Sequence, residues 1–252
     1  MTSFLLALSF LTIVPAYGNK VAGEKEMANS LYAYPLVGLF IGGFLALAAY
    51  ISDILSLGIG GDALVVVLWI ILTGGLHMDG LMDTADGLFS GKERERKLEI
   101  MKDSRNGAMG VISFGAILLL KFAFLVSMPL QYKILALLLA PVIGRAVMVY
   151  SIVYFSYARS KPGLGKCFGE EAGKAKFLGA ITFTLVVAFI IAGPIGVGLA
   201  LVTLLMAAII AKGIGGVLGG QTGDTYGALC ETSETIFLIA IVIGMAGSLN
   251  GL

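Results

Sequence analysis

The chain has 252 residues, of which 58% are hydrophobic and only 13% are charged, and its mean hydropathy is +0.96. Soluble globular domains are typically about one-quarter charged, so the composition excludes an ordinary soluble protein and indicates that lipid is the main solvent. The net charge of +1 gives no support for a nucleic-acid partner. We expect one integral membrane domain over residues 1–252, all-α in class and built as a polytopic transmembrane helix bundle.

The first apolar segment, residues 1–15, resembles a secretory signal in length. It lacks the positively charged residues that precede the apolar run of such signals. We therefore expect a retained segment that lies at the membrane interface or re-enters the bilayer.

About seven apolar stretches after this segment approach or exceed the length that crosses a bilayer. They comprise residues 31–51, 63–76, 111–128, 133–155, 177–192, 195–211 and 235–247. The dipeptide Gly193-Pro194 separates the fifth from the sixth.

The connections between these stretches alternate in charge. Residues 52–62, 129–132 and 193–194 contain almost no Lys or Arg, whereas residues 17–30, 92–106 and 156–176 are rich in both. Because basic loops stay on the cytoplasmic side, the pattern places the second set and residues 212–234 in the cytoplasm. It places the C-terminus outside.

The densest group of chemically active residues follows the second predicted span. Asp79, Asp83 and Asp86 are spaced i, i+4, i+7 and would share one face of a helix, with His77 close by. Such a cluster favours a hard divalent cation, because Mg²⁺ binds a few carboxylates together with substrate phosphate. The simpler alternative is an acidic helix end that faces water. His77 fits a general base, a ligand or an interfacial residue equally well.

Two later loops carry further candidates. Lys102, Arg105 and Asn106 lead into the third span, where they could bind phosphate oxygens or serve only as the positive-inside signal. The glycine-rich loop 215–234 contains no P-loop, but its backbone could approach a phosphate closely, and Asp224, Glu231 and Glu234 offer oxygen ligands. Cys167 and Cys230 lack the spacing of a metal site.

Two charged residues fall within predicted spans. Lys121 and Arg145 lie in the third and fourth apolar stretches. An ionisable residue in a span usually faces the interior of the bundle and serves function. We expect Arg145 to contact substrate, and Lys121 to pair structurally or extend to the interface.

Three long motifs then identify a resemblance. The segments TGGLHMDGLMDTADG (73–87), EIMKDSRNGAMG (99–110) and GGQTGDTYGALCETSE (219–234) occur in the order found in the cobalamin synthase family, adenosylcobinamide-GDP ribazoletransferases. The N-terminal FLLALSFLTIVP and the later YPLVGLFIGG are also similar to that family, so the resemblance covers most of the chain.

The resemblance implies a reaction. Adenosylcobinamide-GDP would react with α-ribazole, or with its 5′-phosphate, to give adenosylcobalamin, or its 5′-phosphate, and GMP. It implies a Mg²⁺-dependent enzyme in the inner or plasma membrane of a prokaryotic cell, with its active site facing the cytoplasm. It leaves a homo-oligomer open.

The same resemblance, combined with phosphoryl-transfer chemistry, suggests roles for individual residues. One or two Mg²⁺ ions, for which Mn²⁺ could substitute, would bind Asp79, Asp83, Asp86, Asp224 and Glu231. His77 or Asp83 would take the proton of the attacking hydroxyl. The substrate would contact Lys102, Asp103, Arg105, Asn106, Arg145, Gln221, Thr222 and Glu234.

Two other functions compete with this interpretation. CDP-alcohol phosphotransferases also place spaced Asp residues at a membrane helix end, but their D-G-x-x-A-R signature has no Arg counterpart in residues 79–84. An ion-coupled transporter would fit the Gly193-Pro194 break and Arg145. Its acidic groups would be expected near the bilayer midplane rather than in loops.

Overall fold

The computed structural model describes residues 2–18, 22–159, 168 and 172–249, with side chains as far as residue 245; Cys167 lies outside these ranges. Within them the regular secondary structure is helical, with one isolated bridge between Tyr157 and Gln221. The helices are α1 (Thr2–Leu11), α2 (Glu24–Ser30), η1 (Leu31–Ala33), α3 (Tyr34–Ile54), α4 (Ile59–Leu72), α5 (Leu76–Leu88), α6 (Arg94–Ile100), α7 (Ala108–Val126), α8 (Leu130–Tyr154), α9 (Lys174–Leu218) and α10 (Gly223–Leu249).

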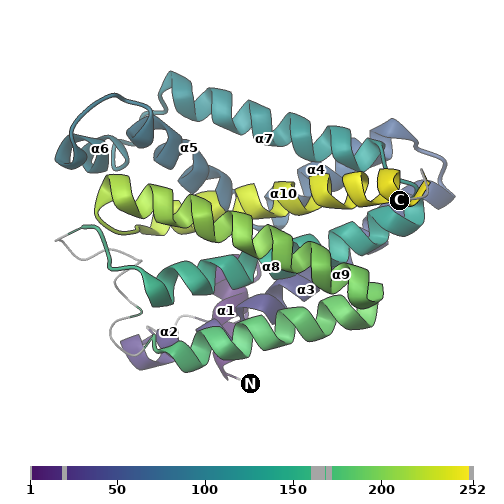
Figure 1. Ribbon diagram of the computed structural model, residues 1–252, viewed down its shortest axis with the longest axis horizontal. Helices are drawn as coiled ribbons and strands as arrows, with labels where there is room; N and C mark the ends of the chain where they lie inside the picture. The colour runs from purple at the N-terminus through teal and green to yellow at the C-terminus, as the bar shows by residue number, and fades with distance from the viewer. Residues whose placement is uncertain (1, 19–21, 160–167, 169–171, 250–252) are drawn as a thin grey trace.

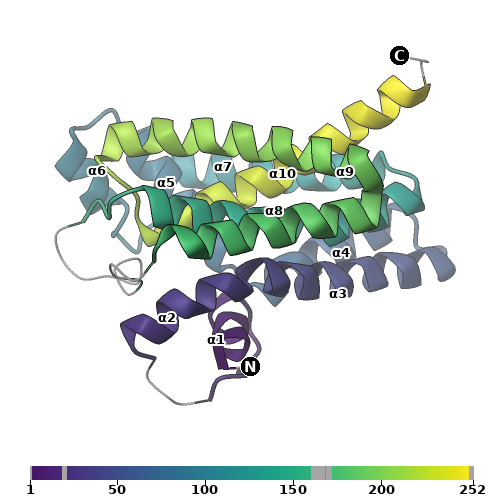
Figure 2. The same ribbon diagram turned by 60° about the horizontal axis from the view of Figure 1, so that its bottom comes forward.

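The long helices run side by side along the longest axis of the molecule, with α8 in the middle (Figures 1 and 2). In the most apolar stretch of α8, 83% of the residues are buried inside the bundle, against 17% in α7 and 22% in α9. Helix α8 packs against α3, α9 and α10. The outer helices therefore present their apolar side chains to lipid, as the composition predicted.

Glycine allows α3 to lie directly against α8. A Cβ atom at Gly38 would be 2.4 Å from the backbone oxygen of Pro141, and one at Gly42 would be 2.6 Å from that of Leu137. Both distances are shorter than any real contact, so only glycine permits this approach. Small residues at four-residue spacing are a common packing device in membrane helices.

The prediction of about seven spans agrees with the structure. Five helices have the length and composition to cross a membrane, and α4 with α5 forms a further apolar pair bent by 85°. One of the five, α9, consists of two helices joined at Gly193, whose backbone is not helical (φ 59°, ψ −154°), followed by Pro194. The two arms of α9 fold back on each other (Figure 1) and form the predicted fifth and sixth spans.

The second predicted span, 63–76, ends earlier than expected. Helix α4 ends at Leu72, and Gly74 and Gly75 then adopt left-handed backbone angles (φ 62° and 71°). Glycine enters this region without steric cost, so the chain turns sharply here. The turn gives the acidic segment a helix of its own, α5, aimed in a new direction.

The N-terminal helix α1 lies across the long helices (Figure 2). Its ten residues span about 15 Å, roughly half of the hydrocarbon core of a bilayer. The segment therefore cannot cross alone, in agreement with the predicted interfacial or re-entrant segment. It packs against α2, η1 and α3.

The basic connections gather at one end of the bundle. Helices α2 and α6, the beginning of α9 and the turn between α9 and α10 lie together there, while the bend in α9 and the α7–α8 turn lie at the opposite end (Figure 1). The alternation of basic and uncharged loops thus corresponds to the two ends of the structure.

Candidate functional site

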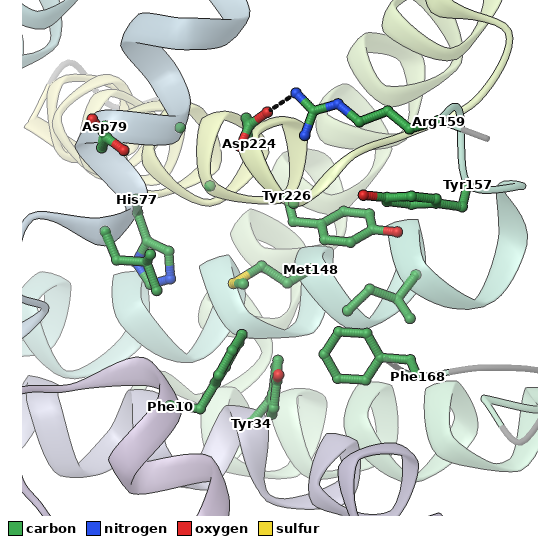
Figure 3. Close-up of a pocket in the computed structure, with 15 residues that line it drawn as sticks. Phe10, Tyr34, His77, Asp79, Met148, Tyr157, Arg159, Phe168, Asp224 and Tyr226 are labelled. Carbon is green, nitrogen blue, oxygen red and sulfur yellow. Dashed lines mark hydrogen bonds and ion pairs between the residues drawn. The ribbon is translucent and has the colours of Figure 1, made fainter. Parts of the chain in front are cut away.

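A cavity opens between α5, α10 and the segment that follows α8. Its volume is about 150 Å³. Figure 3 shows charged side chains along one side and aromatic side chains along the other. The lining residues are Phe10, Tyr34, Leu76, His77, Asp79, Gly80, Met148, Ile152, Tyr157, Arg159, Phe168, Gly223, Asp224, Tyr226 and Gly227.

Two of the predicted metal ligands, Asp79 and Asp83, have carboxylates that no described residue binds. Asp79 is exposed and Asp83 half-buried, and neither carboxylate has a hydrogen bond or ion pair with any residue that the structure describes. Asp83 is close enough to Asp79, Asp86 and Asp224 to interact with their charges, and it also interacts with the positive charge of Arg159. These carboxylates therefore form one electrostatic group.

Two glycines allow α5 and α10, which carry these carboxylates, to approach each other closely. A Cβ atom at Gly80 on α5 would lie 2.6 Å from the backbone oxygen of Asp224, and one at Gly227 on α10 would lie 3.0 Å from Cα of His77. Each helix thus offers a glycine where the other approaches. The glycines of the two motifs set the distance between Asp79 and Asp224 through this close contact.

Arg159 is the main charged residue of the cavity that sequence analysis did not single out. Its Nη2 donates to Oδ2 of Asp224 at 2.6 Å (Figure 3). Backbone pairing holds it there: the amide of Ala158 donates to the oxygen of Gln221, whose amide donates to Ser156. This pairing needs Gly220, because a Cβ there would lie 2.3 Å from the oxygen of Ser156.

The glycine-rich loop therefore does not wrap a phosphate in the way its composition suggested. It pairs with the segment after α8. Gln221 is fully buried and donates through Nε2 to the backbone oxygen of Ala211. Thr222 exchanges hydrogen bonds with Thr225 at the start of α10, as in a capping box. Both predicted substrate contacts have a structural role in this arrangement.

Asp86 also has a structural role. Its two carboxylate oxygens accept hydrogen bonds from the amides of Gly107 (2.7 Å) and Gly110 (2.8 Å) at the start of α7. Those first amides have no partner within the helix, and a negative charge there is favoured by the helix dipole. Asp86 therefore fastens α7 to α5.

Five charged or titratable groups form a buried cluster beside the cavity. Lys121 on α7 contacts Glu231 and Glu234 on α10 at 2.6 Å each. Arg145 on α8 pairs with Glu234 and lies 3.3 Å from Nδ1 of His77. None of the five is more than 3% exposed. Glu231 thus faces Lys121 rather than the free carboxylates, and Arg145 and Glu234 engage each other rather than a substrate.

The contact with Arg145 fixes the protonation pattern of His77. A guanidinium group can only donate hydrogen bonds, so Nδ1 must accept and the proton of the neutral ring lies on Nε2. A histidine whose free nitrogen is occupied in this way is poorly placed to take a proton from a hydroxyl group. The predicted general base is therefore better sought in Asp83 or Asp79.

The predicted contacts in the basic loop are spread over the surface. Arg105 pairs with Asp103 at 2.7 Å and remains 87% exposed, and hydrogen bonds from Arg105 lower the pKa of Asp103 to about 2. Asn106 is exposed. Lys102 lines a second hollow together with Arg159, which also lines the cavity.

The described residues contain no group of three His, Cys, Asp or Glu side chains placed to hold a metal ion by themselves. Mg²⁺ does not require such a group, since it is usually bound through one or two carboxylates and completed by substrate phosphate and water. Asp79 and Asp83 supply two carboxylates without competing partners. The donor set fits Mg²⁺ that binds together with a phosphorylated substrate.

Comparison with known proteins identifies the family. The profile of the cobalamin-5-phosphate synthase family matches residues 3–242. An adenosylcobinamide-GDP ribazoletransferase of Desulforamulus reducens is 46% identical over 96% of this chain and 97% of its own length. Proteins of the same name from a Roseiflexus species and from Clostridium novyi are 42% and 39% identical over 94% and 96% of this chain, and over 88% and 97% of their own lengths. No solved structure matches. The chain belongs to the cobalamin-5-phosphate synthase family.

Proposed function

We propose that this protein transfers the phosphocobinamide group of adenosylcobinamide-GDP to a ribose hydroxyl of α-ribazole or its 5′-phosphate, with release of GMP. The names of the relatives support this reaction. A new phosphorus–oxygen bond forms to the ribose, and the bond between the two phosphates of the donor breaks. The hydroxyl proton passes to a base, and the electron pair of the broken bond leaves with GMP.

The charge balance of the site supports the proposal most directly. Asp79, Asp83 and Asp224 contribute three carboxylates, and Arg159 is the cation paired with them among the described residues. Such a site would repel a diphosphate on its own. Mg²⁺ held by Asp79 and Asp83 would supply the positive charge that lets the same site accept a diphosphate, and it would stabilise the negative charge of the leaving phosphate.

Each charged side chain of the site then has a separate role. Arg159 can exchange its contact with Asp224 for a phosphate oxygen, since guanidinium groups bind phosphate strongly. Asp79 and Asp83 would hold the metal, and whichever carboxylate remains free would accept the hydroxyl proton. Lys102 lines the adjoining hollow and would bind the second phosphate of the donor. Helix α5 keeps the carboxylates fixed while the substrates enter.

The position of the cavity within the bundle indicates which side of the membrane it faces. Asp224 lines the cavity and lies in the first turn of α10, at the end of the bundle where the basic helices α2 and α6 also lie (Figure 1). Because basic segments remain in the cytoplasm, we infer that the site opens to the cytoplasmic side of the plasma membrane. Nucleotide-activated substrates are available on that side.

Substitution of the free carboxylates tests the metal assignment. Asp79→Asn and Asp83→Asn should each lower turnover by about 10²–10³-fold, the usual loss when one group that stabilises developing charge is removed. Their remaining activity should need more Mg²⁺. Asp53→Asn is the matched control, because Asp53 is exposed and lines a hollow away from this site. Wild-type activity and Mg²⁺ dependence in both site variants would refute the assignment.

A further inference from the structure

The uncharged half of the cavity has an aromatic wall from separate segments. Phe10 of α1 and Tyr34 of α3 stack with ring centroids 6.4 Å apart, and Phe168 meets them edge-on at 6.2 and 6.3 Å. Tyr226 and Met148 lie alongside (Figure 3). Aromatic rings and a methionine sulfur pack favourably on a flat aromatic ligand.

The size of the cavity restricts what can enter. Its volume of about 150 Å³ is below the roughly 300–1,000 Å³ of sites that enclose a whole small-molecule ligand. A corrin ring or a complete nucleotide therefore cannot fit inside. A single flat ring system can, with the rest of its molecule extending past Asp79 and Asp224 at the charged side.

The wall also carries a polar atom without a partner. His77 lines the cavity, and its buried Nε2 has no hydrogen-bond partner among the described residues. Because Arg145 occupies Nδ1, Nε2 carries the proton and is a donor. A buried donor without a partner is unfavourable, so a ligand with one acceptor atom on its ring would satisfy it.

We propose, resting on the proposed function, that this cavity binds the benzimidazole base of α-ribazole. The base is flat and apolar. One of its ring nitrogens carries the ribose, and the other is an unprotonated acceptor that matches Nε2–H of His77. With the base in the aromatic half, the ribose lies toward Asp79, Asp224 and Arg159, where its hydroxyl meets the phosphate. Guanine is another flat ring among the substrates, so its competition for the cavity decides between the two.

Kinetics of the purified full-length protein separate the two substrates. Phe10→Leu keeps an apolar side chain but removes the ring, so we expect the KM for α-ribazole to rise about tenfold or more, with kcat nearly unchanged and less than a twofold change in the KM for adenosylcobinamide-GDP. The control is Phe44→Leu, which removes an exposed ring of α3 outside the cavity. A rise confined to the KM for adenosylcobinamide-GDP would overturn the proposal.

His77 supplies a second, independent comparison. His77→Phe removes the donor at similar size and should raise the KM for α-ribazole about five- to tenfold, the usual effect of one hydrogen bond. His77→Gln places an amide donor near the same position and should recover most of the affinity. Equal values in the two variants would contradict the role assigned to Nε2.

Direct binding distinguishes failure of this inference from failure of the proposed function. Equilibrium dialysis with 5,6-dimethylbenzimidazole should show saturable binding that Phe10→Leu weakens and guanosine does not displace. Binding without any cobalamin formation would contradict the proposed function and leave this inference standing. Turnover without binding of 5,6-dimethylbenzimidazole, or displacement by guanosine, would overturn the inference alone.

Discussion

Replacement of Lys121 by Met should strongly destabilise the bundle. The Lys121 side chain is 2% exposed, and its ammonium group contacts Glu231 and Glu234 at 2.6 Å each. The same group lies 4.0 Å from the centroid of the Trp69 ring. After the change Glu234 keeps Arg145, but Glu231 has no ion-pair partner among the described residues. Loss of one partner from a buried pair typically costs about 3–5 kcal/mol, because the remaining charge stays buried and uncompensated.

The paired variant Lys121→Met/Glu231→Gln makes the test specific. It removes both charges, so most of the lost stability should return, and the difference between single and double variants measures the coupling of the two residues. Unfolding in micelles of increasing SDS fraction, followed by circular dichroism, gives the free energy of unfolding. The control is Arg96→Met, which breaks an ion pair with Glu99 that is about two-thirds exposed on both sides and should leave stability nearly unchanged.

The outcome decides whether the cluster holds the bundle together. A Lys121→Met protein as stable as the wild type would refute the reasoning. So would a double variant no more stable than the single variant, because the cost would then come from lost packing rather than from the orphaned carboxylate of Glu231.

Three further substitutions test separate parts of the site. Arg159→Met should reduce turnover about 10²–10³-fold with little loss of folded protein in gel filtration, and normal turnover would exclude Arg159 from the site. Gly80→Ala should destabilise the folded protein by about 1–3 kcal/mol and lower its activity, because the new Cβ would lie 2.6 Å from the backbone of Asp224. The control is Gly115→Ala, whose Cβ meets no atom within 4 Å and which should be tolerated. Asp86→Ala removes the acceptor of the two amides at the start of α7, so it should lower stability by about 1–2 kcal/mol and with it the melting temperature. The Mg²⁺ requirement should not change; a changed requirement would return Asp86 to the metal site.

The fold was largely predictable because lipid imposes simple rules. Apolar length and the alternation of Lys and Arg between loops predicted the spans, and Gly193-Pro194 predicted the bend within α9. The break at Gly74-Gly75 was not predicted, because small residues are common inside membrane helices and the apolar Leu76 follows the two glycines directly. The position of α1 also needed the structure, since it depends on packing against distant helices.

The site was predictable where a local pattern marks its residues, as for the spaced carboxylates of α5 and for Asp224 in the glycine-rich loop. Asp79 and Asp83 share a face of α5 by spacing alone. Glu231 looked like another oxygen ligand, and only the structure shows that Lys121, 110 residues earlier in the chain, binds it. Arg159 sits in a basic loop whose residues all resemble a topology signal. Its pairing with Asp224 depends on the contact between two distant loops, which no local pattern encodes.

The most direct test of the account is turnover by the detergent-purified protein with adenosylcobinamide-GDP and α-ribazole, measured as GMP release and cobalamin formation. We predict equal amounts of both products with Mg²⁺, none with EDTA, and recovery when Mg²⁺ is restored. Folded protein that forms no cobalamin, or forms it equally well in EDTA, would contradict the proposed reaction or its dependence on the metal.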